Sequence, residues 1–203
     1  MRKKLSHIRP MHSDDVDMVV AVHQTSFPGF FLSFLGPGFL KLYYRNICLS
    51  PDGLCYVYTN DEGLPCGFVA GTSNPRGYYS RLLKREWFNF AIASIYPVCR
   101  HPKILPRLLR ALLHPGKNPV GKDVAGLFSL GVLPELQGTG AGKKLVQKFL
   151  AEAKVKNCKK VFLTTDRENN KRVNNFYENL GFSVERQYET PEGRKMNEYW
   201  INL

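Results

Sequence analysis

Residues 124–142 read VAGLFSLGVLPELQGTGAG, and this stretch decides the fold of the chain. Its first part, Val124–Leu133, is apolar or small at every position except Ser129, which predicts a buried strand. Residues 142–154 then carry an apolar stripe at helical spacing, made of Leu145, Val146, Phe149, Leu150 and Ala153. A strand, a glycine-rich turn and a helix therefore follow one another directly, as in proteins that pack helices on a sheet.

The turn between this strand and this helix has the composition of a phosphate-binding turn. Three glycines let the backbone bend tightly and bring several N–H groups to one point. The start of the following helix adds unpaired donors and about half a unit of positive dipole charge. We expect a phosphate or pyrophosphate to be held by Gln137, by Lys143 and by the backbone N–H groups of Gly138, Thr139, Gly140, Ala141 and Gly142.

Two familiar phosphate loops do not fit this turn. A P-loop requires Ser or Thr after Gly-Lys, but Gly142-Lys143 is followed by Lys144. A dinucleotide fingerprint begins at Gly138-Thr139-Gly140, but its third glycine is replaced by Lys143. A plain flexible connection between strand and helix stays open as the alternative.

The rest of the chain predicts further strands and helices without strict alternation. The expected strands are 5–9, 54–59, 67–72, 160–165, 182–188 and 195–201. The expected helices follow the N-cap Ser13, cover 39–47, cover 78–113 with breaks at Pro97, Pro102 and Pro106, and cover 170–180. Gly181 is a typical left-handed stop after the last helix. We therefore expect one α/β (α+β) domain over 1–203, with a basic helical insertion at about 78–122.

Net charge and cysteine content limit the kinds of binding partner and the cellular compartment that we expect. The 203 residues carry a net charge of +12, which suggests nucleic acid, a membrane surface or a phosphorylated small molecule. Nine of the cations lie between Arg76 and Lys117, against the single acid Glu86. The five cysteines are scattered without any C-x-x-C pair, so we expect neither a disulfide framework nor a metal site. Together with Pro28-Gly29, which interrupts the uncharged stretch 18–40, this predicts a cytoplasmic protein.

Two motifs resemble the GCN5-related N-acetyltransferase (GNAT) superfamily. Its signature [RQ]-x-x-G-x-[GA] is matched by Gln137, Gly140 and Gly142. Its later motif N-x-x-A-x-x-[FL]-Y-x-x-x-G-F resembles Asn170–Phe182, with Val173 in place of Ala. The resemblance covers nearly the whole chain except about 78–122. It implies a central mixed, mostly antiparallel sheet that is splayed at its centre and flanked by helices, with acetyl-CoA as co-substrate and no metal.

The resemblance also implies roles for individual residues. Backbone groups of residues 130–133 would bind the pantetheine arm, with the N–H of Val132 or Leu133 polarising the thioester carbonyl. Asn170 would hydrogen-bond the same arm. Tyr177 would protonate the departing thiolate, because a phenol with a pKa near 10 stays protonated at neutral pH. Without the motif, the interpretation of Tyr177 as a core aromatic residue of an amphipathic helix is the favoured one.

The proton acceptor and the acceptor substrate are not fixed by the sequence. Many relatives place a Glu on the strand before the turn, where this chain has Gly126, which leaves Asp166 as a base, or Ser129 or Thr165 holding a water molecule. His101 and His114 have no partners at metal-ligand spacing and are expected at the surface.

The expected reaction is acetyl transfer to the primary amine of a small molecule, with an anionic amino sugar or sugar nucleotide favoured by the cations of the insertion. Those cations also suit peripheral contact with a membrane. The alternative is a nucleic-acid-binding module or a non-catalytic CoA-binding module. The aromatic residues interleaved with cations that nucleic-acid binding requires are not visible, so no nucleic acid is expected.

Overall fold

The computed structural model describes residues 7–100, 121 and 123–203, and it contains one seven-stranded sheet in the order β1-β2-β3-β4-β5-β7-β6. All neighbouring strands are antiparallel except β4 and β5, which are parallel. The mixed, mostly antiparallel sheet expected from the resemblance is therefore confirmed. The strands are β1 (His7–Pro10), β2 (Gly53–Thr59), β3 (Pro65–Thr72), β4 (Val124–Val132), β5 (Lys160–Asp166), β6 (Ser183–Glu189) and β7 (Lys195–Asn202).

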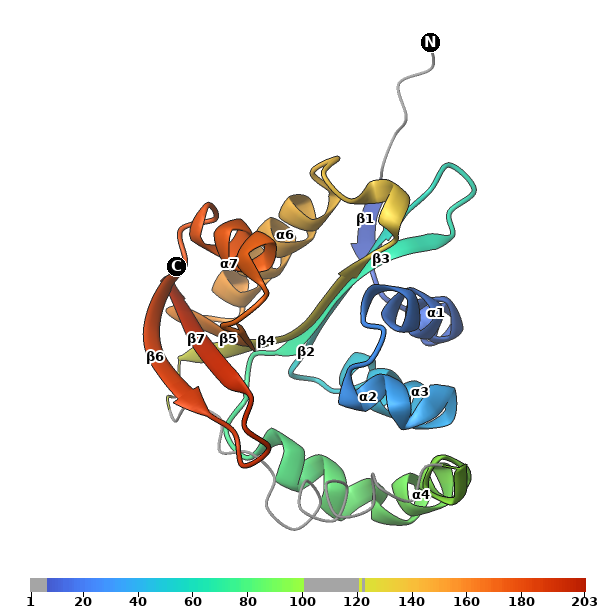
Figure 1. Ribbon diagram of the computed structural model, residues 1–203. Helices are drawn as coiled ribbons and strands as arrows, with labels where there is room; N and C mark the ends of the chain where they lie inside the picture. Colours follow the sequence, from blue (N-terminus) through green and yellow to red (C-terminus); the bar gives the residue numbers. More distant parts are fainter. Residues whose placement is uncertain (1–6, 101–120, 122) are drawn as a thin grey trace.

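Helices cover both faces of the sheet (Figure 1). One face carries α1 (Val16–Ser26), α2 (Phe31–Phe34) and α3 (Gly36–Cys48). The other carries α6 (Ala141–Val155) and α7 (Lys171–Glu178). Each face buries its own apolar cluster, centred on residues such as Tyr44 and Phe68 on the first face and Phe149 and Tyr199 on the second. The sheet is thus the middle of three layers.

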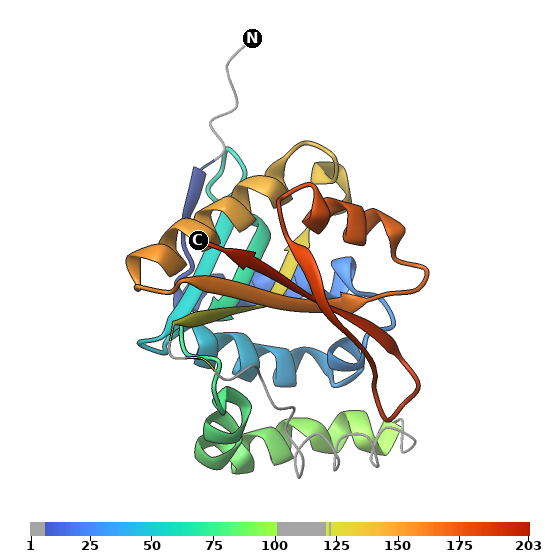
Figure 2. The ribbon, with the colours of Figure 1, turned by 90° about the vertical axis from the view of Figure 1, so that its left-hand side faces the viewer.

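Helix α4 (Tyr78–Arg100) forms a further layer beyond α3, as Figures 1 and 2 show. It runs antiparallel to α3, since Phe90 stacks on Phe39 with ring centroids 4.6 Å apart and Arg85 hydrogen-bonds to Asn46. The described half of the predicted insertion is therefore helical. Residues 101–120, the other half, lie outside the described residues.

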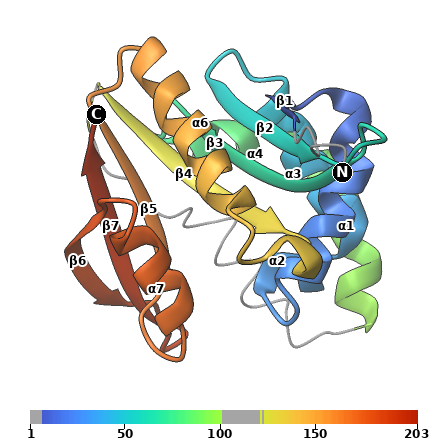
Figure 3. The same ribbon diagram turned by 90° about the horizontal axis from the view of Figure 1, so that it is seen from above.

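The centre of the sheet is splayed. Strand β5 pairs with β4 only opposite Val124, Ala125 and Gly126, after which β4 continues along β3 and β5 along β7. The register between β3 and β4 shifts between Ala70 and Gly71, which leaves Phe128 as an extra residue on β4. Figure 3 shows β4 and β5 diverging from their shared start. The bulge and the splay confirm the expectation drawn from the family.

Two local predictions are wrong. Ser13 does not cap α1: residues Ser13–Asp15 form a 3₁₀ turn, and the His12 N–H donates to the Asp15 carboxylate over 2.8 Å before α1 starts at Val16. Pro97 does not break the helix that was expected over 78–113, because α4 continues through Pro97 to Arg100. Pro97 is buried, and its ring lies beside Gly36 of α3, so packing offsets the backbone hydrogen bond that a proline removes.

Candidate active site

A cleft of about 1000 Å³ lies where β4 and β5 separate. Its walls are the exposed edge of β4, the turn that follows β4, the first residues of α6, the ends of β5 and α7, and the ends of α1 and α2. The residues from both sequence motifs therefore meet in one place, although about 30 residues separate them along the chain.

The glycine turn lies at one end of the cleft and presents free backbone donors. Helix α6 begins at Ala141, so the N–H groups of Ala141, Gly142 and Lys143 have no partner within the helix. Gly138 and Gly140 adopt φ values of +82° and +88°, a left-handed conformation that favours glycine. A Cβ at either position would meet no atom within 4 Å, so the turn faces open space.

Thr139, one of the residues expected to donate to a ligand, donates instead to another residue of the turn. The Thr139 N–H donates to the Leu136 carbonyl over 3.2 Å, and the Thr139 hydroxyl donates to the same oxygen over 2.7 Å. Thr139 therefore closes the turn on itself and does not point a donor at a ligand. The side chains of Gln137 and Lys143 line the cleft, as expected.

The pairing of β4 decides which of its N–H groups face the cleft. Leu133 donates its N–H to the Cys66 carbonyl over 3.0 Å, so the Leu133 N–H faces β3 and cannot polarise a thioester. Residues of an antiparallel strand alternate in this direction, so the N–H groups of Val132 and Leu130 face away from β3, toward the cleft. The Val132 carbonyl, outside the ladder, accepts a hydrogen bond from Ser26 over 3.1 Å. Of the two expected donors, Val132 remains, and Leu130 joins it.

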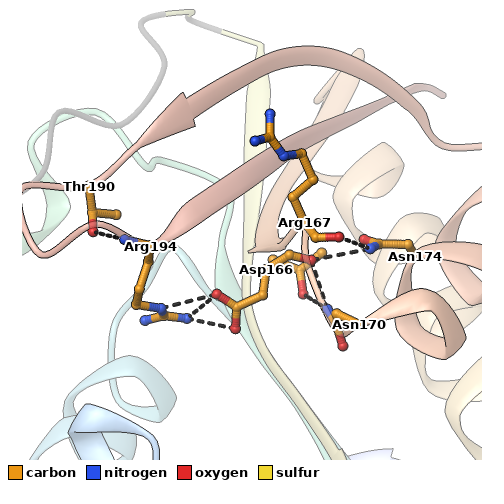
Figure 4. A network of polar contacts seen from close by, with 7 residues as sticks. Asp166, Arg167, Asn170, Asn174, Thr190 and Arg194 are labelled. Atoms are coloured by element: carbon orange, nitrogen blue, oxygen red, sulfur yellow. Dashed lines mark hydrogen bonds and ion pairs between the residues drawn. The ribbon is translucent and has the colours of Figure 1, made fainter.

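A polar network at the end of β5 holds the start of α7 (Figure 4). The Asn170 side-chain amide donates to the Thr165 hydroxyl over 2.8 Å and to the Asp166 carbonyl over 3.0 Å. Asn174 donates to the carbonyls of Asp166 and Arg167, both over 3.2 Å. Because both amide hydrogens of Asn170 are used, its side-chain oxygen is the atom left to accept a hydrogen bond from a ligand in the cleft.

Tyr177 lies on α7 and lines the cleft, although only 6% of its surface is exposed. Its ring packs against Phe176, Phe182 and Tyr199. Burial raises the pKa of its phenol above the ordinary value, so the hydroxyl keeps its proton at neutral pH. Within the described part of the chain the hydroxyl makes no hydrogen bond, and it is not shielded completely from the cleft. Tyr177 is therefore packed among core aromatic residues at the wall of the cleft, and its role as a general acid stays a prediction.

The opposite end of the cleft is lined by side chains from distant segments. Phe27, Phe30 and Phe31 come from the α1–α2 region, Tyr79 from α4, and Arg194 and Met196 from the β6–β7 hairpin. The Arg194 guanidinium lies 5.5 Å from the centre of the Phe30 ring. It also donates to both oxygens of Asp166 over 2.8 Å, as Figure 4 shows.

The cations of the described part of the insertion, residues 78–100, do not line this end of the cleft. Among the described residues 78–100, Tyr79 alone contributes to the wall. Arg81 donates to the Asn74 carbonyl over 3.0 Å, and Arg85 pairs with Glu86 and Asn46. Their side chains are thus used to fix α4.

His23 is a cleft residue that the sequence did not single out. Its Nδ1 lies 2.6 Å from the Tyr44 hydroxyl, while its Nε2 is buried without a partner among the described residues. Burial lowers the pKa of the ring to about 4, so His23 is neutral near pH 7. The signal in the sequence was a histidine on the apolar face of α1, a position that more often holds a core residue.

Asp166, Thr165 and Ser129, which were expected to take the proton or to hold a water molecule, lie in different environments. The Asp166 carboxylate is engaged by Arg194, and the Thr165 hydroxyl accepts from Asn170. Ser129 is buried on the bulged part of β4 and lines the cleft. None of these groups is an unengaged carboxylate or imidazole.

Two further findings concern residues 7–100, 121 and 123–203. This part of the chain holds no group of three or more His, Cys, Asp or Glu side chains arranged to bind a metal ion. None of its helices combines the length and the hydropathy needed to cross a membrane. His101 and His114, expected at the surface, lie outside the described residues.

Comparison with known proteins identifies the family to which the chain belongs. No curated protein sequence matches the chain. The fold is similar to that of SsHAT (22% identity, 97% of this chain and 98% of that one, TM-score 0.65) and of Ard1 from Thermoplasma volcanium (16%, 98% and 97%, 0.63). It is also similar to that of the ribosomal-protein-S18-alanine N-acetyltransferase from Escherichia coli (15%, 98% and 94%, 0.59). Residues 19–182, which include the glycine turn and the whole motif Asn170–Phe182, match the model of the acetyltransferase (GNAT) family, and the chain belongs to that family.

Proposed function

We propose that this protein transfers the acetyl group of acetyl-CoA to the primary amine of a small molecule. The observation that carries the proposal is the splayed cleft, with free helix N–H groups at one end and inward-facing strand N–H groups along its wall. Such a cleft fits a long ligand with a pyrophosphate at one end and a carbonyl at the other.

The residues at the turn fit the CoA pyrophosphate. The N–H groups of Ala141, Gly142 and Lys143 point out of the start of α6, and the open space beside Gly138 and Gly140 leaves room for phosphate oxygens. The Lys143 side chain adds a positive charge at the same end of the cleft. The Asn170 side-chain oxygen supplies an acceptor that an amide-containing arm needs.

Acetyl-CoA, when bound, supplies an activated acyl group, and the chain then has two tasks at the reacting carbonyl. The first is to stabilise the negative charge that develops on the carbonyl oxygen. The N–H groups of Val132 and Leu130 face the cleft and are held in place by the β3–β4 ladder. Preorganised backbone donors of this kind lower the barrier by a few kcal/mol.

The second task is to place protons. Tyr177 holds its proton at neutral pH and has no hydrogen bond to give up among the described residues, so its hydroxyl can donate to the leaving sulfur. The amine must lose a proton, and neutral His23 is the group that lines the cleft with an unused ring nitrogen. Because its Nε2 is buried, we place His23 at the acceptor end as a group that takes this proton through a water molecule and not by direct contact.

The acceptor end favours a ring-containing, anionic amine. Phe27 and Phe30 offer aromatic faces for a sugar or base, and Arg194 offers a guanidinium beside them. This arrangement supports an amino sugar or sugar nucleotide as the first class to test. Among proteins of similar fold, one is named for phosphinothricin and another for the alanine of a ribosomal protein, so the fold alone does not choose.

The test is turnover by the purified chain, measured as CoA release with identification of the acetylated product. Amino-sugar nucleotides, polyamines, amino acids and short peptides would serve as acceptors, with acetyl-CoA alone as the background. We expect amine-dependent CoA release that is strongest with an amino-sugar nucleotide or a related anionic amine. Acetyl-CoA binding without release on any amine would identify a CoA-binding module and contradict the transferase.

A further inference from the structure

Helix α4 exposes an unusual amount of apolar surface on the side that faces away from α3. Five large side chains of this helix are more than half exposed: Trp87 (65%), Phe88 (59%), Ile92 (52%), Ile95 (60%) and Tyr96 (68%). We call these five residues the outer stripe. Contiguous apolar patches of this kind are rare on soluble monomers and mark a surface that meets a partner.

The outer stripe follows the period of the helix. Phe88, Ile92, Ile95 and Tyr96 are spaced by four, three and one residues, which places them on one side of α4. The opposite side is already packed, since Phe90 stacks on Phe39 and Pro97 lies beside Gly36. Helix α4 therefore has two apolar sides, and the residues that the structure describes pack against only one of them.

Cations frame the outer stripe at both ends. Arg81, Lys84 and Arg85 lie in the two turns before it, and Arg100 lies in the turn after it. The one acid of the helix, Glu86, is engaged by Arg85 and Asn89. The segment therefore offers positive charge around an apolar centre.

An apolar centre flanked by cations fits some classes of partner better than others. A nucleic acid would be attracted by the cations but would leave Ile92 and Ile95 exposed to water. A protein partner would also bury the apolar residues, with the cations at its polar rim, and the experiment below separates that case from a lipid surface. A helix that lies in a lipid interface needs an apolar side with Trp, Phe and Leu-like residues and cations at the level of the head groups. Trp87 and Tyr96 are the residue types that prefer that level.

We propose that the outer stripe of α4 docks the protein on a bilayer that contains anionic lipids. The aliphatic and aromatic side chains enter the boundary between head groups and acyl chains, and Lys84 and Arg100 contact lipid phosphates. Tyr79, in the first turn of the same helix, lines the cleft, so the docked helix is continuous with the acceptor end of the site.

The experiment is sedimentation of the full chain with vesicles of two compositions. One is phosphatidylcholine alone, and the other is phosphatidylcholine mixed with an equal amount of phosphatidylserine. We expect binding to the mixed vesicles that weakens as salt is added, and little binding to the neutral ones. The indole emission of Trp87, isolated by subtracting the spectrum of Trp87→Phe, should shift to the blue on binding.

A pair of substitutions separates the outer stripe from general surface hydrophobicity. Ile92→Ser with Ile95→Ser should lower the partition onto mixed vesicles by roughly tenfold or more, because two branched aliphatic side chains no longer enter the lipid. The control is Leu64→Ser with Val155→Ser, which removes two exposed aliphatic side chains from other parts of the surface. It should bind as the wild type does.

Three results would overturn the proposal. One is wild-type protein that stays in solution with both vesicle types. Another is equal binding by the stripe variant and the control. The third is a dimer in solution that the stripe variant abolishes, without any lipid binding, which would assign the outer stripe to a second copy of this chain. CoA release by the stripe variant without vesicles should match that of the wild type, so this test is independent of the proposed transfer.

Discussion

The two ends of the cleft are built in different ways. The turn end is made of consecutive residues, and the binding groups proposed for it are the backbone N–H donors of Ala141, Gly142 and Lys143. The acceptor end is made of side chains from four separate elements, including Phe30, Tyr79 and Arg194. A short motif can therefore describe the first end, while the second end exists only after the chain has folded.

This difference predicts that substitutions at the two ends change different quantities. At the turn and on α7 they should alter the handling of acetyl-CoA and the chemical step. At the acceptor end they should alter the acceptor's KM and the stability of the α1 face. The four predictions below test that division.

The largest effect is expected from Tyr177→Phe. The substitution keeps the ring and its contacts with Phe176, Phe182 and Tyr199 but removes the hydroxyl that would protonate the leaving sulfur. We expect kcat to fall by roughly tenfold to a thousandfold, the lower part of the range for one general acid, with little change in acetyl-CoA affinity. Single-turnover kinetics near neutral pH would measure it. Full kcat with chemistry rate-limiting would leave Tyr177 as a packing residue only.

The next effect is a loss of folding stability at acidic pH that depends on the buried His23 side chain. Its pKa is about 4 in the folded protein, against about 6.5 in the unfolded chain. The unfolded chain therefore binds more protons between these values, and stability falls as the pH is lowered from about 6.5 toward 4. The full shift corresponds to about 3 kcal/mol. His23→Gln, which keeps a polar partner for Tyr44, should flatten this part of the curve of unfolding free energy against pH.

Acidic groups titrate at still lower pH and are shared by both proteins, so the comparison with wild type isolates the effect of His23. Asp15 has a lowered pKa, held down by hydrogen bonds from Arg9 and the His12 N–H against the opposing effect of burial. It should contribute equally to both proteins. Parallel curves for wild type and His23→Gln would show that His23 is protonated as easily as an exposed histidine.

A smaller effect is expected from Arg194→Met. It removes the ion pair with Asp166 and the contact with Phe30, both at the acceptor end. We expect the acceptor's KM to rise by about tenfold, the size of one lost charged contact, with acetyl-CoA affinity unchanged. Arg186→Met is the matched control, because Arg186 lies on the same hairpin but stacks on Tyr188. A loss of acetyl-CoA affinity in Arg194→Met would break the division between the two ends.

The sequence was sufficient where function depends on local backbone geometry. The strand, turn and helix over 124–155 form as predicted, and so do the 53–72 hairpin and the stop at Gly181, whose φ is +92°. These features follow from hydrophobic period and from glycine conformations, which are properties of neighbouring residues.

The sequence was insufficient where the position or the hydrogen bonding of a residue depends on a segment far along the chain. The Leu133 N–H is unavailable because Cys66, on another strand, accepts it. The helix over 78–100 survives Pro97 because Gly36 of α3 makes room for the ring. Arg194 reaches Asp166 across 28 residues, and His23 lines the cleft because Tyr44 holds its other nitrogen. None of these pairings leaves a periodic signal.

The most direct test of the central claim is calorimetric titration of acetyl-CoA into wild type, Gly140→Asp and Gly63→Asp. Both glycines have left-handed φ values, +88° and +80°, and a Cβ at either would meet open space, so the two variants carry the same added charge and the same backbone strain. Only Gly140 lies at the proposed pyrophosphate site. We expect tight binding by wild type and Gly63→Asp and a loss of at least about a hundredfold in affinity in Gly140→Asp, from the carboxylate placed against phosphate. Equal affinities for acetyl-CoA in all three folded proteins would contradict the assignment of the turn.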